Sequence, residues 1–497
     1  MLESIALFLT NNYIKCQIFG FSIDDYENLP NMQTAIVYLS VGDISHFEVI
    51  KDFMAALKAQ GVRLLVGGHF CISIKALDIF HRYESIDIII RYPSAEYALL
   101  DTIKALTEKT DLKNVKGITF RECHDKNGIV HTKRDKMPPN IDHLESPLEK
   151  DGGNGHWQSI IISIGCHNDC QYCIGQVPYK NDLFNPNDFW RKKSELKIVD
   201  EIQSFMDQGI DSFHFYCDEF FGVSDENKQF VSNLVKEILK RNLKIRFRVS
   251  AKPRNIRDNL EIFPMLLESG LHEINIGIDS GLERFHRVYK TGSTLADVLS
   301  VLGFLHSQRL AFDVTFIFYD PFLNLVEIKE NLCFLREIYP FFSALPFPYS
   351  RYLDSRILNS ALILRYGMPI IDELERSNLI LESPGFPANP GYRFLNNETL
   401  LVYSGYSYVN KSVLTKIRHF FYDKELVTYF NNSFELFPLI VMEKIVHWVE
   451  NEKTEDLGKI VAGIERFTKD FFGPLIDNIG DAFPKYKNPA LSSWLKQ

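Results

Sequence analysis

The sequence predicts an α/β protein in three parts: a Rossmann-like N-terminal domain, a central TIM-like partial (β/α)6 barrel and a mainly helical C-terminal region. Three observations lead to this prediction. Short apolar runs alternate with helical segments over residues 1–120, and the alternation becomes more regular over residues 157–340. Over residues 341–497 it fades, and helical patterns dominate. Alternating strands and helices are typical of parallel sheets with crossover helices.

In the first part, apolar runs predict strands and periodic stretches predict helices. We expect strands at residues 18–21, 35–39, 64–66 and 86–90, and helices at residues 47–59 and 95–106. Ser40 follows one of these strands, and Gly67 and Gly68 follow the next. Glycines at a strand end let a ligand or another backbone approach closely, although a lone Gly-Gly pair is more often a turn. Residues 121–156 are polar and interrupted by Pro and Gly, which predicts a linker.

The central part shows repeated β/α units, which indicate the TIM-like partial (β/α)6 barrel. Strands are expected at residues 159–164, 212–217, 245–249, 273–278 and 312–318, with helices at 194–208, 227–241, 260–269 and 295–307. In folds of this kind the chemistry takes place at the carboxyl ends of the strands, where variable loops stand on a rigid sheet. The residues that follow each strand are therefore the candidates for function.

Three cysteines follow the first strand of the barrel. Gly165 breaks the strand, and Cys166, Cys170 and Cys173 then have the spacing C-x3-C-x2-C. Three thiolates on one loop suit a 4Fe–4S cluster and would leave one iron open to another ligand, as catalysis requires. A redox dithiol and a Cys3His zinc site that includes His167 are alternatives. Zinc usually draws two separated ligand pairs, and a dithiol has no use for the first cysteine, so the spacing favours the open cluster.

With Tyr172 before the last cysteine, the motif becomes C-x3-C-x-aromatic-C and resembles the signature of radical S-adenosylmethionine (SAM) enzymes. The resemblance implies that the amine and carboxylate of SAM bind the open iron. It implies that electron transfer then cleaves SAM to methionine and a 5′-deoxyadenosyl radical, which abstracts hydrogen from a small-molecule or peptide substrate. An external electron donor of the flavodoxin or ferredoxin type is the expected partner.

The same resemblance assigns SAM contacts to the ends of other strands. Asp218 and Glu219 lie where the family contacts the methionyl amine, although helix capping or a solvated turn would also explain them. Asp279 replaces the glutamate of the family's Gly-Ile-Glu-Ser element, and Tyr319 replaces a glycine near the adenine. The candidate SAM-binding residues are Tyr172, Asp218, Glu219, Asp279, Ser280, Lys290 (in a Lys-Thr-Gly pattern) and Tyr319.

The order of features in residues 1–120 resembles the cobalamin (B12)-binding domain that precedes the radical SAM core in one subclass. This resemblance implies cobalamin contacts at Ser40, Gly67 and Gly68. The sequence has no Asp-x-His-x-x-Gly cobalt-ligand motif, which radical SAM members of the subclass generally lack. It also begins at a helix, over residues 4–13, where the family has a central strand first. We therefore expect either a vacant slot in the sheet or an upstream start codon.

We consider three functions, of which the first two follow from these resemblances. The first is cobalamin-dependent methylation of the substrate, and the second is a cobalamin-independent dehydration, epimerisation or rearrangement. The third, from another class, is a non-catalytic iron–sulfur or zinc scaffold protein. Residues 341–497 are expected to cover the barrel mouth over the substrate.

The composition indicates which kinds of partner and which cellular compartment to expect for this protein. The formal net charge is −9 with no basic stripe, so neither a nucleic acid nor an anionic membrane surface is an expected partner. The first residues lack the features of a signal peptide, and no apolar run approaches the roughly 18 residues that span a bilayer. Eight cysteines, three of them clustered, fit a reducing compartment. We expect a cytoplasmic protein.

Overall fold

The computed structural model describes residues 2–18, 32, 35–41, 46–68, 75–91, 95–122, 128–133, 140–148, 157–173, 190–222, 224–343, 355–364, 368, 370–381, 391–416, 436–451, 456–474 and 493–494. The chain forms two compact units. The first comprises residues 1–251, 259–272 and 363–391, and the second comprises residues 252–258, 273–362 and 392–497. Within the described residues, no helix combines the length and the apolar character needed to cross a membrane.

The N-terminal sheet in the first unit has five strands. Their order is β1 (Ile36–Val41), β2 (Arg63–Gly68), β3 (Ile88–Ile90), β4 (Ile118–Arg121) and β5 (Ile129–His131). The first three strands run parallel, and β4 and β5 are added in antiparallel orientation. The expected strands at residues 35–39, 64–66 and 86–90 are confirmed, whereas residues 19–21 of the first expected strand lie outside the described residues.

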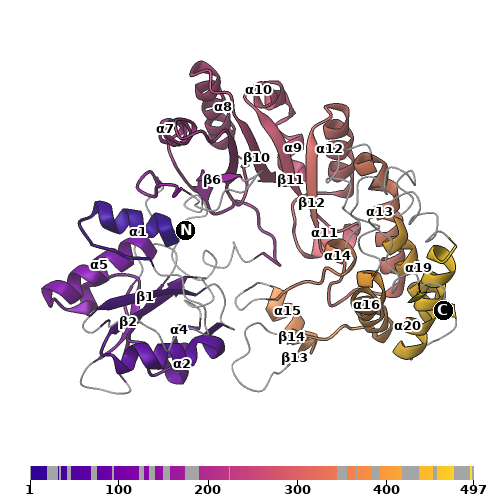
Figure 1. The fold of residues 1–497 in the computed structure, drawn as a ribbon, viewed down its shortest axis with the longest axis horizontal. Helices are drawn as coiled ribbons and strands as arrows, with labels where there is room; N and C mark the ends of the chain where they lie inside the picture. Colours follow the sequence, from indigo (N-terminus) through magenta and orange to yellow (C-terminus); the bar gives the residue numbers. More distant parts are fainter. Residues whose placement is uncertain are drawn as a thin grey trace. The chain divides into compact units, whose positions relative to one another are not determined.

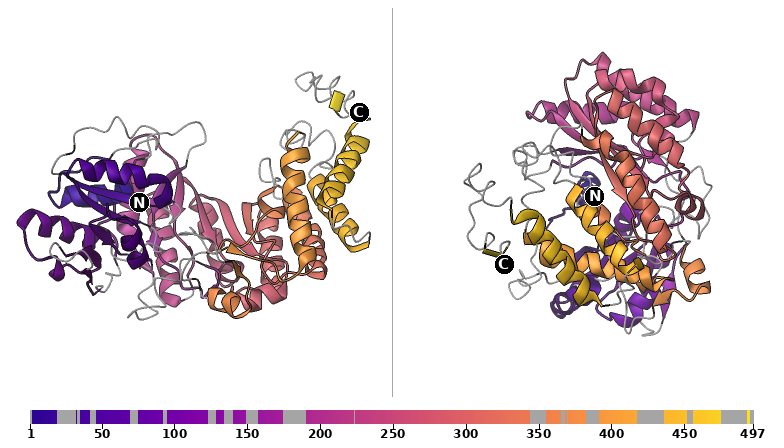
Figure 2. Two further views of the ribbon diagram at one scale, coloured as in Figure 1. Left: turned by 90° about the horizontal axis from the view of Figure 1, so that it is seen from below. Right: turned by 90° about the vertical axis from the view of Figure 1, so that its right-hand side faces the viewer.

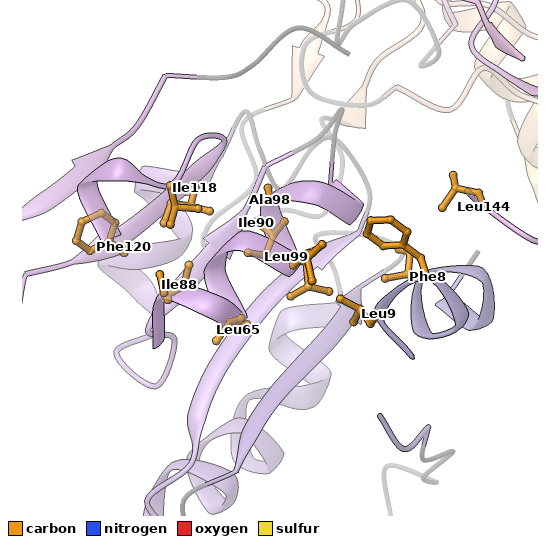
Figure 3. Close-up of a cluster of buried hydrophobic side chains, with 14 of the residues drawn as sticks. Phe8, Leu9, Leu65, Ile88, Ile90, Ala98, Leu99, Ile118, Phe120 and Leu144 are labelled. Carbon is orange, nitrogen blue, oxygen red and sulfur yellow. The ribbon is translucent and has the colours of Figure 1, made fainter. Parts of the chain in front are cut away.

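Helices cover both faces of this sheet. They are α1 (Leu2–Asn11), α2 (His46–Ala59), α4 (Ala76–Arg82) and α5 (Ala95–Glu108), with a short 3-10 turn at Leu112–Asn114. Figure 1 shows α1 and α5 on one side and α2 and α4 on the other. Because strand side chains alternate between faces, Leu65 packs with α1 and α5, whereas its neighbours Leu64 and Val66 pack with α2 and α4. Figure 3 shows the first of these cores, which includes Phe8 of α1 and Leu99 of α5.

Of the two alternatives expected for the missing first strand, a vacant slot at the centre of this sheet is not found among the described strands. β2 pairs with β1 along one edge and with β3 along the other, so the described strands form one continuous ladder. In addition, the segment predicted to be a linker supplies β5 to the sheet, and its Ile141 and Leu144 belong to the core of Figure 3. Turn-forming residues in this segment therefore mark connections within a folded part of the chain.

The first unit also contains the beginning of the central α/β sheet. The parallel strands β6 (Gln158–Ile161), β9 (Ser212–Tyr216) and β10 (Arg246–Ala251) alternate with α7 (Glu195–Met206) and α8 (Asp225–Lys240). The short strand β7 (Ser163–Ile164) continues β6 after a one-residue break and pairs with β8 (Arg191–Lys192). Both helices begin at a serine whose hydroxyl accepts a backbone N–H of the first turn, which satisfies one of the free donors there.

Two buried ion pairs anchor β8. Nη2 of Arg191 lies 2.6 Å from Oε1 of Glu96 in α5, and Nζ of Lys193 lies 2.7 Å from both carboxylate oxygens of Glu201 in α7. Burial alone would raise the pKa of Glu96, but hydrogen bonds from His143 and Arg191 together with the arginine charge hold it below its ordinary value. The strand that supports the cysteine loop is thus fixed to helices of both the N-terminal domain and the central sheet.

Within the first unit the strands lie in the order β6-β9-β10, the same as their order in sequence. β11 (Leu271–Asp279) and β12 (Ala311–Phe316) run parallel, mostly within the second unit. The accompanying helices are α9 (Pro253–Arg257), a 3-10 turn (Leu260–Ile262) continued by α10 (Phe263–Glu268), α11 (Glu283–Val288), α12 (Leu295–Ser307) and α13 (Leu325–Ser343). The predicted β/α alternation is confirmed for five strands of the expected partial barrel.

The C-terminal part of the second unit is mainly helical. It contains α14 (Ser355–Leu358), α16 (Asn397–Val409), a π-helical turn (Asn410–Leu414), α19 (Phe437–Asn451) and α20 (Leu457–Phe472). Figure 2 shows α16, α19 and α20 side by side, and each contacts the other two. Residues 363–391 of this part of the chain belong to the first unit. They contain α15 (Ile370–Arg376) and β13 (Ile380–Leu381), and β13 pairs with β14 (Gly391–Tyr392). The predicted helical character of residues 341–497 is confirmed in these described segments, whereas residues 417–435 lie outside the described residues.

Candidate active site

The cysteine loop begins where the first strand of the central sheet ends. The backbone N–H of Ile162 donates to the carbonyl of Tyr216 in β9, which fixes the strand end. Gly165 then turns the chain at φ +97°, a conformation that favours glycine. Cys170 is buried, and Cys166 and Cys173 are partly buried. The loop therefore presents three thiols at the carboxyl end of a parallel sheet, as the sequence predicted.

The three thiols lie on one short loop. A Cys3His zinc site would require four side chains that converge on one point, whereas the thiolates of a 4Fe–4S cluster bind different iron atoms. Soft thiolate donors on one short loop therefore fit an iron–sulfur cluster.

The environment of Cys166 bears on its protonation. Burial and the negative charge of Glu219 raise the pKa of this thiol, and hydrogen bonds from Asn168 act in the opposite direction. Burial and the charges of Glu219 and Asp218 likewise raise the pKa of Cys217 well above its ordinary value. A thiol in such surroundings ionises when a metal binds it, because the charge of the metal outweighs these effects.

The two acidic candidates that follow β9 lie in different environments. Oδ2 of Asp218 accepts a 2.8 Å hydrogen bond from the backbone N–H of Gly165, so this exposed residue holds the start of the cysteine loop. Glu219 is buried, with 1% of its surface exposed, and accepts the N–H of Phe221 at 3.3 Å. Glu219 is thus the carboxylate that acts electrostatically on Cys166. Tyr172 is partly buried within the same loop.

The second unit places Asp279 and Ser280 at the end of β11. Asp279 has φ +68° and is buried, and its Oδ2 lies 2.9 Å from Nζ of Lys252, the N-cap residue of α9. Ser280 is fully buried, and its Oγ lies 3.3 Å from Oδ1 of Asn331 in α13. The same amide oxygen accepts the backbone N–H of Gly281 at 2.9 Å. Lys252 and Asn331 therefore fix the conformation of this strand end.

The Lys290-Thr291-Gly292 pattern is connected to the same strand end through His286. This buried histidine has Nδ1 2.7 Å from Oγ1 of Thr291 and Nε2 2.9 Å from the carbonyl oxygen of Ser280. Lys290 itself is exposed and has φ +48°. The structure thus brings Ser280 and the Lys-Thr-Gly pattern together through a histidine that sequence reasoning did not select.

The structure places Tyr319 among aromatic side chains of the second unit. It is fully buried, its hydroxyl lies 3.5 Å from Sδ of Met442, and its ring meets the ring of Tyr403 edge to face at 5.0 Å between centroids. These contacts come from α19 and α16. The described contacts of Tyr319 are therefore packing contacts with C-terminal helices, and an adenine contact stays a prediction.

The three candidate cobalamin contacts meet at the carboxyl ends of β1 and β2. Ser40 lies opposite Gly67 in the strand register and is exposed. A Cβ atom at Gly67 would lie 2.6 Å from the hydroxyl of Tyr38, and a Cβ at Gly68 would lie 2.4 Å from the carbonyl oxygen of Val41. The packing of the domain alone therefore requires glycine at position 68, which has φ +126°, whereas the space at Gly67 is limited by the end of the Tyr38 side chain. Ser40 is the exposed member of the three candidates.

Comparison with known families identifies the central region. Residues 160–334 match the model of the radical SAM superfamily. The chain contains a radical SAM domain. The radical SAM domain spans the cysteine loop, the Asp279–Ser280 strand end and the Lys290–Gly292 pattern. No curated protein sequence matches the chain.

Solved structures share the fold over most of the chain. One is the cobalamin-dependent S-adenosylmethionine radical enzyme OxsB with aqua-cobalamin and SAM bound, with a TM-score of 0.70 and 18% identity over 93% of this chain and 72% of OxsB. Another is the radical SAM methyltransferase TsrM from Kitasatospora setae with tryptophan and a SAM analogue bound, with a TM-score of 0.56 and 15% identity over 77% of this chain and 74% of TsrM. At these identities the similarity shows a shared fold.

These comparisons confirm the predicted family and the predicted fold class. The radical SAM domain implies an enzyme with SAM and a 4Fe–4S cluster as cofactors, which requires a reductant and a substrate. The assignment of individual residues to these cofactors stays a prediction. Sequence reasoning did not select Asn168, His286 and Asn331, because isolated polar residues carry no motif and their partners are distant in the sequence or within one loop.

Proposed function

We propose that this protein uses a 4Fe–4S cluster, held by Cys166, Cys170 and Cys173, to cleave SAM and to start cobalamin-dependent methylation of a small-molecule or peptide substrate. One observation carries the proposal: the three cysteines occupy the loop at the carboxyl end of the first strand of a radical SAM domain. When bound, the cluster supplies the electron that splits SAM into methionine and a radical able to abstract hydrogen from carbon.

The chain's own residues prepare this loop. Gly165 provides the turn, and its backbone N–H donates to the carboxylate of Asp218. The strand β7, which leads into the loop, is paired with β8. The buried Cys170 directs one ligand into the protein, where water has little access. These contacts fix the backbone before a cofactor binds, so little ordering remains to be done at that step.

We further propose that strand ends of the radical SAM domain bind SAM. A carboxylate can receive the methionyl ammonium through a charge-assisted hydrogen bond, and Glu219 is the buried carboxylate next to the cysteine loop. Asp279 already has Lys252 as a partner, so its contribution is to orient the strand end together with Ser280.

Cobalamin dependence rests on the N-terminal domain. OxsB, which has the same fold over 93% of this chain, is a cobalamin-dependent enzyme with aqua-cobalamin bound, and TsrM is a methyltransferase. In this chain the exposed Ser40 fits a ligand at the carboxyl edge of the sheet. A second candidate function is a cobalamin-independent radical dehydration, epimerisation or rearrangement. It is favoured by the finding that Tyr38 and Val41 already occupy the space beside Gly67 and Gly68.

One anaerobic experiment separates these functions. The protein is reconstituted with iron and sulfide, supplied with SAM, a reductant and hydroxocobalamin, and assayed for 5′-deoxyadenosine and for corrinoid retained after gel filtration. Deoxyadenosine with stoichiometric corrinoid supports the methylation proposal. Deoxyadenosine without corrinoid supports the second function, and a reconstituted protein with intact cluster that never cleaves SAM contradicts both.

A further inference from the structure

Asn168 makes two contacts with one sulfur atom of the cysteine loop. Its backbone nitrogen lies 3.5 Å from Sγ of Cys166, and its side-chain nitrogen Nδ2 lies 3.2 Å from the same atom. The backbone donor would exist with almost any residue at position 168. The side-chain donor is specific to this residue, because it requires a short amide that can fold back by two positions.

The second donor matters once Cys166 is a cluster ligand. Each electron that enters an iron–sulfur cluster adds negative charge that is shared with the ligating sulfurs. An N–H directed at such a sulfur stabilises the reduced state more than the oxidised state, and it therefore raises the reduction potential. Glu219 lies close enough to raise the pKa of Cys166 and acts in the opposite direction, since its negative charge disfavours added electrons.

We propose that the side-chain amide of Asn168 is a positioning residue that raises the reduction potential of the cluster by donating to Sγ of Cys166. This inference rests on the proposed function, because it requires the cluster. The amide makes the cluster easier to reduce by an external electron donor.

The chain contains a matched control for this amide. Gln171 lies in the same loop, but its Nε2 donates to the carbonyl oxygen of Asp169 at 2.9 Å and not to a sulfur. Asn168→Ala removes the side-chain donor and leaves the backbone donor. Asn168→Asp keeps the size of the side chain and replaces the donor with a negative charge. Gln171→Ala removes an amide that has no role in the proposal.

The experiment is a redox titration of the reconstituted full-length proteins without SAM, followed by electron paramagnetic resonance of the reduced cluster, with iron content measured in parallel. We expect the midpoint potential to shift to more negative values in Asn168→Ala and further in Asn168→Asp. We expect no shift in Gln171→Ala, and equal iron content in all four proteins.

Each other outcome has a defined meaning. An unchanged or more positive potential in Asn168→Ala with full iron content overturns this inference and leaves the proposed function intact. A shift of equal size in Gln171→Ala overturns it as well, because the effect would then be a general loosening of the loop. Loss of iron from Asn168→Ala alone would show that Asn168 is needed for assembly of the cluster. That result would contradict the proposal, which requires an intact cluster with a changed potential. Absence of a cluster signal from the wild-type protein would overturn both this inference and the proposed function.

Discussion

Replacement of Lys193 by methionine tests how strongly the stability of the fold next to the cysteine loop depends on a buried ion pair. The Lys193 side chain is fully buried, and Nζ lies 2.7 Å from both carboxylate oxygens of Glu201 and 3.1 Å from Oγ of Ser146. Its backbone N–H donates to the carbonyl of Ile162 at the end of β6. Removal of the ammonium group would leave the Glu201 carboxylate, itself only 8% exposed, without its main partner.

The expected loss follows from this geometry. Removal of one partner of a buried ion pair typically costs about 3–5 kcal/mol, because a charge is left unpaired. Lys197 lies 3.9 Å from Oε1 of Glu201 and compensates in part, so we expect a loss near the lower end of that range. Addition of Glu201→Gln removes the unpaired charge and should recover more than half of the loss. The control is Lys329→Met, which breaks an exposed pair with Glu450 at 2.6 Å and should cost about 1 kcal/mol or less.

Urea unfolding of the cluster-free proteins, followed by tryptophan fluorescence, measures these differences. Trp190 precedes β8 directly and reports on the affected region. Equal losses in Lys193→Met and Lys329→Met would show that burial of the Lys193–Glu201 pair adds no stability, because the two substitutions differ mainly in the burial of the pair. A double variant as unstable as Lys193→Met would show that the loss comes from packing and not from the unpaired charge.

Three further predictions concern other parts of the chain. Replacement of all three motif cysteines by alanine should abolish both the absorbance of the cluster and SAM cleavage, whereas Cys217→Ala should keep its iron; retention of either property in the triple variant would contradict the ligand assignment. Gly281→Ala should destabilise the protein by about 1–3 kcal/mol in thermal unfolding, because its Cβ would lie 2.6 Å from Phe334, whereas Gly277→Ala meets nothing closer than 3.5 Å and should be neutral. The pKa of Glu96 in the folded protein lies below the ordinary pKa of a glutamate. The ionised Glu96 therefore stabilises the fold at pH values above the ordinary pKa, and this stabilisation is lost as the pH falls through the lowered pKa. Urea midpoints measured against pH should therefore fall less steeply in acid for Glu96→Gln than for the wild type, and parallel profiles would contradict this.

Much of the fold followed from local patterns in the sequence. The helix expected at residues 295–307 is α12 without any change of bounds, because Thr294 and Asp297 form a reciprocal capping box at its start. The strands of the central sheet were recognisable because buried apolar residues recur at every second position, as Phe247, Val249 and Ala251 do in β10. The cysteine loop was recognisable because short runs of closely spaced cysteines are typical of proteins that bind iron–sulfur clusters.

Other features depended on contacts that no local pattern encodes. The continuity of the N-terminal sheet is set by the pairing of β2 with β1 and β3, and strand order is a tertiary property. The connection of Ser280 to Thr291 passes through one histidine side chain. Tyr319 was assigned to a ligand from its position in a motif, whereas its described contacts are with helices more than 80 residues further along the chain, around Tyr403 and Met442.

The central claim is that the C-x3-C-x2-C loop holds a cluster with one iron open to SAM. The most direct measurement is electron paramagnetic resonance of the reconstituted, reduced protein before and after addition of SAM. We expect the signal of a reduced 4Fe–4S cluster that changes on addition of SAM, and no such signal in the variant with all three cysteines replaced. A cluster signal that SAM leaves unchanged, or one that survives the loss of all three cysteines, would contradict it.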